Sequence, residues 1–130
     1  MLHPNQFRVN EAWIAFRLND APICTERDGD FNCFALMDAA SCFILTTAFV
    51  PAKDMQVSKL EARRMLKKGS EHKHKLPATL FIPSGEAAEA LTQEAQRQSV
   101  TVVRVPEDQL MIFIGEAREG FKGHFGARTQ

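Results

Sequence analysis

Two runs of β-forming residues joined by a short polar turn constrain this fold more than any other feature. The runs cover residues 31–37 and 42–50 and are rich in Phe, Leu, Ile, Val and Thr. This pattern predicts an antiparallel hairpin, and a two-residue loop at 39–40 places Met37 opposite Cys42. A slip of one residue exchanges the two faces, but both faces are mostly apolar. We therefore expect the hairpin in the middle of a sheet that is covered on both sides.

The rest of the chain predicts further strands and helices. Expected strands cover residues 12–18, 78–82 and 100–105, and expected helices cover residues 54–68, 86–98 and 107–121. Asp54 is expected to cap the first of these helices, and Gly69 is expected to end it. Gly115 weakens the last helix, so a short strand over 110–114 is the alternative there. Residues 1–11 are expected to form an extension or a lead-in strand.

Length and composition predict a single α/β domain over residues 1–130, with an ordered core at about 12–121. The chain is 45% hydrophobic, enough for one compact core. No apolar run approaches the ~20 residues that span a bilayer, and the first residues lack a secretion signal. We expect a cytoplasmic, bacterial protein with no membrane partner. Of its three cysteines, Cys33 and Cys42 lie in strand-like apolar runs, and buried, reduced thiols are expected there instead of a disulfide.

The element order predicts a mixed five-stranded sheet, with three antiparallel strands followed by two parallel ones and helices on both faces. Trp13 opens the first strand, Asp38 and Ser41 flank the hairpin turn, and Leu-Phe-Ile-Pro-Ser-Gly at 80–85 joins a strand to a helix. Over residues 12–121 this pattern resembles the ribonuclease-H-like fold shared with retroviral-integrase-type cores. The resemblance implies a ribonuclease-H-like topology.

The family reaction requires clustered carboxylates that hold two divalent metal ions. The first-strand acid is expected about three residues after Trp13, where Ala15, Phe16 and Arg17 stand, and the second is replaced by Pro83. Glu116 alone matches the third. The resemblance therefore implies the fold without its nuclease centre, and we predict no catalytic residue, no metal ligand and no cofactor.

His72 and His74 have the only spacing typical of metal ligands. Structural zinc needs about four ligands, and no other Cys or His is near in the sequence. Lys73 and Lys75 also repel a cation, so a solvated loop is expected.

Charge is zero overall but uneven along the chain. Residues 59–75 hold seven cations and two acids, a surplus of five that the remainder of the chain balances. The seven cations are Lys59, Arg63, Arg64, Lys67, Lys68, Lys73 and Lys75. They form either a solvated surface or a site for nucleic acid or an acidic partner, and no aromatic residue lies among them to stack on bases.

Three functions are compatible with these patterns. The first is a non-catalytic interaction or assembly module, with apolar residues 111–113 covering an unknown protein partner or a second copy of the chain. The alternative is weak nucleic-acid binding through residues 59–75. The third is a divergent metal-dependent nuclease, which needs carboxylates from outside the family positions.

Overall fold

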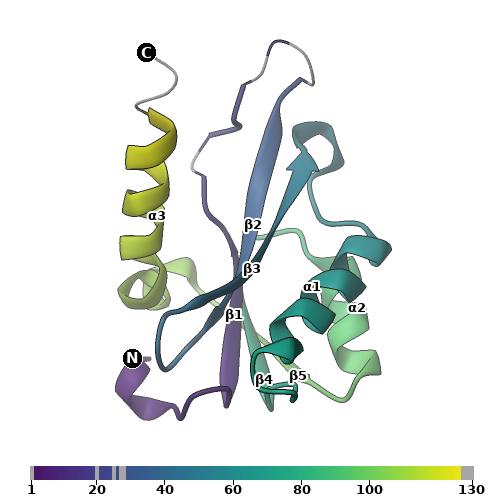
Figure 1. The fold of residues 1–130 in the computed structure, drawn as a ribbon, viewed down its shortest axis with the longest axis vertical. Helices are drawn as coiled ribbons and strands as arrows, with labels where there is room; N and C mark the ends of the chain where they lie inside the picture. The colour runs from purple at the N-terminus through teal and green to yellow at the C-terminus, as the bar shows by residue number, and fades with distance from the viewer. Residues whose placement is uncertain (1, 20, 25, 27–28, 127–130) are drawn as a thin grey trace.

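The computed structural model describes residues 2–19, 21–24, 26 and 29–126, with the backbone alone at 124–126 (Figure 1). The strands are β1 (Ala12–Arg17), β2 (Phe31–Asp38), β3 (Ile44–Pro51), β4 (Thr79–Pro83) and β5 (Thr101–Val105). The α-helices are α1 (Lys59–Glu71), α2 (Glu89–Arg97) and α3 (Met111–Gly126). Short 3-10 helices cover Pro4–Gln6, Ala52–Asp54 and Glu107–Gln109.

The five strands form one mixed sheet in the order β3-β2-β1-β4-β5. β1 pairs antiparallel with β2 and parallel with β4, and β4 pairs parallel with β5. α1 and α2 cover one face and α3 covers the other, as Figure 1 shows. The predicted α/β class and sheet are confirmed.

The core has two layers because β1 and β2 alternate their side chains between the two faces. Trp13 and Leu36 pack toward α1 and α2, whereas Ile14 and Met37 pack toward α3. Every residue of β1 except Arg17 is buried. β1 and β2 thus lie inside the sheet, and side chains of the helices pack on both of their faces.

The predicted hairpin register is wrong, and so is the central position of its second strand. Met37 pairs with Ile44, not Cys42, because the turn is longer than two residues and Cys42 has a φ of 59°. A bulge between Leu36 and Met37 shifts the register further. β3 is an edge strand whose Thr47 and Phe49 are exposed, so its apolar content does not reflect cover on both faces.

The N-cap of α1 lies four residues later than predicted. Its N-cap is Ser58, whose hydroxyl accepts a hydrogen bond from the Glu61 amide, whereas Asp54 ends a 3-10 helix. Gly69 lies within α1, not at its end. This helix packs on the sheet through four buried residues: Ala62, Met65, Leu66 and Gly69.

The ends of the chain also differ from expectation. Residues 111–114 are helical, so the alternative of a strand there is wrong. Phe113 is buried, and only Met111 and Ile112 of the predicted apolar surface are exposed. Near the N-terminus the chain forms a 3-10 helix and then packs Phe7 against Phe81 and Phe113.

The three thiols are free, and each has a different environment. Cys33 is buried as expected, Cys42 is only half-buried, and Cys24 is exposed. Within the described part of the chain, no helix combines the length and the hydropathy that a membrane span requires.

Candidate functional site

The outer edge of β3 is the first candidate for an interaction surface. β3 pairs with β2, and no other described strand pairs with it. Natural edge strands are commonly protected by charged side chains, but β3 reads Ile-Leu-Thr-Thr-Ala-Phe-Val-Pro and carries none. The bulge at its start and Pro51 at its end restrict further pairing to residues 46–50.

A groove of about 350 Å³ lies between this edge and α1. β3 contributes Thr46, Thr47, Ala48 and Phe49, and α1 contributes Glu61, Arg64, Met65 and Lys68. Because α1 packs along β3, an extended segment beside the strand lies next to the helix. The groove is formed by two elements that the chain connects through residues 52–58.

The groove is positively charged on its helical side. Arg64 Nη1 lies 3.5 Å from the Glu61 carboxylate, and the Arg64 side chain is still 63% exposed. Lys68 is exposed one turn further along the helix. On the opposite face of the strand, Phe49 is exposed and its ring contacts Phe31 edge-on. Cations thus flank one face of the edge and an aromatic ring flanks the other.

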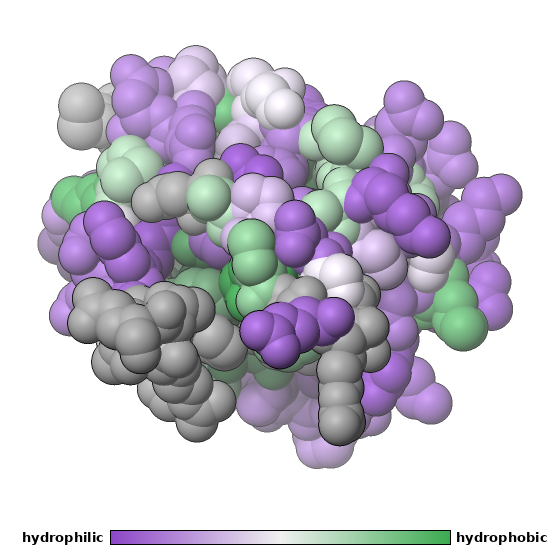
Figure 2. Space-filling view, turned by 90° about the horizontal axis from the view of Figure 1, so that it is seen from above, coloured by the Kyte–Doolittle hydropathy of each residue, from purple (hydrophilic) through white to green (hydrophobic). Residues whose placement is uncertain are grey.

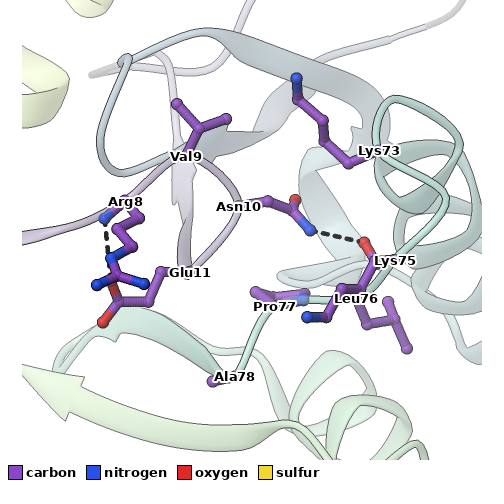
Figure 3. A pocket seen from close by; sticks show the side chains of 9 residues that line it. All are labelled: Arg8, Val9, Asn10, Glu11, Lys73, Lys75, Leu76, Pro77 and Ala78. Carbon is purple, nitrogen blue, oxygen red and sulfur yellow. Dashed lines mark hydrogen bonds between the residues drawn. The ribbon is translucent and has the colours of Figure 1, made fainter.

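A second hollow, of about 780 Å³, lies where β1 and β4 begin (Figure 3). Residues 8–11 line one side, and Lys73 and residues 75–78 line the other. Asn10 Nδ2 donates to the Lys75 carbonyl at 2.9 Å, so it joins the two segments. The Arg8 amide donates to the Glu11 carboxylate at 2.9 Å.

A third hollow, of about 370 Å³, shares Val9, Asn10 and Lys73 with the second. His72 lies here, with its Nε2 3.1 Å from the Leu45 carbonyl and its ring edge-on to the exposed Phe43. The sequence shows no aromatic residue among the cations, but the fold brings Phe43 beside them.

Asp38, which flanks the β2–β3 turn in the sequence, closes this turn through its carboxylate. Its carboxylate accepts hydrogen bonds from the Asn10 amide at 2.6 Å and from the Ser41 hydroxyl at 2.7 Å. These bonds also join the hairpin to the segment that precedes β1.

The seven predicted cations are all exposed, and the fold divides them. Arg64 and Lys68 line the β3–α1 groove, whereas Lys73 and Lys75 line the hollow of Figure 3. Arg63 approaches Glu94 of α2 at 3.8 Å. Sequence reasoning missed the contribution of β3, because the edge position depends on the sheet order and not on the strand's composition.

The residues at the family's carboxylate positions do not fit a two-metal centre. Phe16 is buried in the α3 layer, and Pro83 ends β4. Glu116 acts electrostatically on Cys42 in the β2–β3 turn, whereas Arg17 and Pro83 lie where β1 and β4 end. Within the described ranges, no three side chains of the His, Cys, Asp or Glu type gather to hold a metal ion.

Comparison with known proteins supports the fold alone. No protein-family model and no curated protein sequence matches this chain. A chain in the cryo-EM structure of the simian T-cell lymphotropic virus intasome in complex with PP2A regulatory subunit B56 gamma is similar in structure, with a TM-score of 0.57 and 12% identity. The match covers 85% of this chain and 37% of that chain. The likeness is one of fold alone, and it is consistent with the integrase-like fold expected from the sequence.

Proposed function

We propose that this chain is a protein-interaction domain that binds an extended, acidic segment of a partner protein. The segment adds as a strand to the outer edge of β3. The observation that carries this proposal is an uncharged edge strand, without a described outer neighbour, beside a groove lined by Arg64 and Lys68. Backbone hydrogen bonds supply affinity in such complexes, and alternate side chains supply specificity.

The alternation of side chains defines the partner's chemistry. Side chains on one face of an added strand meet Arg64 and Lys68, which favour Asp or Glu. Side chains on the other face meet the exposed ring of Phe49, which favours apolar residues. The expected segment therefore alternates acidic and apolar residues over about five positions.

The charge of α1 argues against a second copy of the chain as the occupant. Antiparallel pairing of two β3 edges places both α1 helices on the same face of the joined sheet. Each α1 carries five cations and two acids, so the two helices repel each other across the seam. An acidic partner removes this repulsion.

A fluorescein-labelled hexapeptide in which Val and Glu alternate tests the proposal by fluorescence polarisation. We expect Arg64→Glu combined with Lys68→Glu to weaken binding by about tenfold or more, since two charge-assisted contacts are reversed. Lys59→Glu combined with Lys67→Glu is the matched control, because it makes the same charge change on α1 outside the groove residues.

N-methylated peptides test strand addition separately from charge. Only every second amide of an added strand faces β3, so methylation of one alternate set should abolish binding and methylation of the other should not. Equal binding by both methylated peptides, or by a peptide with contiguous Glu residues, contradicts strand addition. Self-association in the absence of peptide would instead favour the second-copy alternative.

A second candidate function is nucleic-acid binding, supported by Phe43 and His72 beside the hollow that Arg8, Lys73 and Lys75 line. Base stacking on an aromatic ring next to cations is the usual chemistry of single-strand binding. Polarisation of a labelled 20-nucleotide single strand tests it. Loss of binding in Lys73→Glu combined with Lys75→Glu, with a steep salt dependence, supports this function. No binding at low salt excludes it.

A further inference from the structure

Three arginines gather near the ends of the parallel strands, away from the groove and the two hollows described above. Arg17 is the last residue of β1, Arg104 lies near the end of β5 and Arg118 projects from α3. All three act electrostatically on Glu86, in the connection between β4 and α2. Figure 2 views this end of the molecule, where hydrophilic residues surround apolar ones near the middle.

Backbone contacts fix two of these guanidinium groups. Arg104 Nη1 donates to the Pro83 carbonyl at 3.0 Å and to the Glu86 carbonyl at 2.6 Å, so it holds the connection that follows β4. Arg118 Nε donates to the Arg17 carbonyl at 3.0 Å, and its Nη1 pairs with Glu107. The Arg118 side chain is only 15% exposed.

Arg17 differs, because its Nε is buried and no described residue accepts a hydrogen bond from it. A buried donor without an acceptor is rare, because the loss of its bonds to water is uncompensated. Glu86 does not satisfy it, since no ion pair between these two side chains occurs in the described part of the chain. Burial raises the pKa of Glu86 above its ordinary value.

The three arginines therefore outnumber the nearby carboxylates Glu86 and Glu107. The strand order also reverses here: the connection after β1 leads to β2 on one side, and the connection after β4 leads to β5 on the other side. In open α/β sheets, ligands bind beyond the carboxyl ends of strands at such a switch point. A positive cluster with a vacant donor at this position suits an anion.

We infer that the phosphate or carboxylate group of a small ligand binds between the ends of β1 and β4, with the Arg17 side chain as its principal donor. Arg118 contributes charge from α3, and Arg104 positions the loop that carries Glu86. This site takes the place in the fold where a metal-carboxylate centre does not fit.

Side-chain NMR of ¹⁵N-labelled arginine in the full chain tests this inference, with inorganic phosphate and succinate titrated separately at constant ionic strength. We expect saturable shifts of the Arg17 Nε–H resonance with one of the two probes. Saturation by phosphate assigns a phosphate-bearing ligand, and saturation by succinate assigns a carboxylate. Arg17→Gln should weaken binding about tenfold or more, judged from the remaining arginine resonances.

Two further variants distinguish a built site from surface charge. Arg17→Lys keeps the charge but lacks Nε, so it should also bind more weakly than the wild type. Lys53→Gln, at an exposed position of the 3-10 helix Ala52–Asp54, should bind as the wild type does. The inference is overturned if neither probe saturates the shifts by about 50 mM, a concentration far above the dissociation constant of a weak specific complex. It is equally overturned if Arg17→Gln binds unchanged.

Discussion

Gly69 of α1 lies directly against the indole ring of Trp13 in β1. A Cβ at position 69 would stand 2.9 Å from Trp13 Cη2 and 2.9 Å from Leu36 Cδ2, closer than carbon atoms normally approach. Both neighbours are fully buried, so neither can move aside easily. The glycine thus sets how closely α1 packs on the sheet.

Gly69→Ala is therefore expected to destabilise the protein. Overpacking costs about 1–3 kcal/mol, which exceeds the ~1 kcal/mol that alanine gains over glycine within a helix. Urea denaturation measures the free energy of unfolding. Gly115→Ala is the matched control, because its Cβ meets only Met111 Cε at 3.8 Å, and there we expect stabilisation of up to ~1 kcal/mol. Equal effects at both positions would contradict the close approach.

Asn10 joins three segments through its own hydrogen bonds. Its backbone N–H donates to the Asp38 carboxylate. Its side-chain Oδ1 accepts from Trp13 Nε1 at 2.8 Å, and its side-chain Nδ2 donates to the Lys75 carbonyl. Its φ is 67°, a conformation that Asn and Gly adopt more readily than Ala.

Asn10→Ala should destabilise by about 1–3 kcal/mol, because Trp13 Nε1 loses its acceptor. Asn10→Gly loses the same side-chain bonds but tolerates the positive φ, so it should be about 1 kcal/mol more stable than Asn10→Ala. Thermal unfolding compares the three proteins. An Ala variant as stable as the Gly variant would show that the backbone conformation contributes nothing.

Glu94 predicts a pH dependence of stability. Hydrogen bonds from Arg97 at 3.0 Å and from Gln98 at 2.7 Å, together with the Arg97 charge, lower the pKa of Glu94 from 4.5 to about 2. A carboxyl whose pKa is lowered by folding stabilises the native state above its unfolded pKa, and this contribution disappears as the pH falls through the folded pKa.

The wild type should therefore melt higher than Glu94→Gln at neutral pH, and the difference should decrease between pH 4.5 and about 2. Differential scanning calorimetry across this range measures the difference. Glu89→Gln is the matched control, since it removes a charge from an exposed position of the same helix. A difference that does not vary with pH would contradict the assignment to Glu94 ionisation.

The cysteines should react with a thiol reagent in a defined order. Cys24 is exposed and should react first, followed by the half-buried Cys42. Burial raises the pKa of Cys33 to about 11, so its thiolate is scarce and its access is blocked. Mass spectrometry after brief iodoacetamide treatment should find Cys33 unmodified until the protein unfolds. Early labelling of Cys33 would indicate local opening of β2.

The sheet was predictable because hydrophobic runs and turn residues identify strands locally. The register of the hairpin was not, because the positive φ of Cys42 and the bulge at Met37 arise from the packing of the two strands. Gly69 shows a similar limit. Its place in the sequence is typical of a residue that ends a helix, but in the structure it lies within α1 and contacts Trp13.

The candidate groove shows the same division between local and long-range information. The exposed cations of α1 follow from helical spacing and composition. Their position beside the outer edge of β3, with which no described strand pairs, depends on the sheet order, since the apolar β3 has the composition of a central strand. Arg17 likewise becomes a candidate for ligand binding only in the structure, where its buried Nε has no acceptor among the described residues.

The parallel pairing of β1 with β4 has a consequence for biosynthesis. Ala12 pairs with Thr79, so the innermost strand of the sheet lacks one neighbour until translation has passed Pro83. A nascent chain shorter than that presents two open edges, on β1 and on β3, to other polypeptides. During this interval the growing chain is expected to depend most on chaperones.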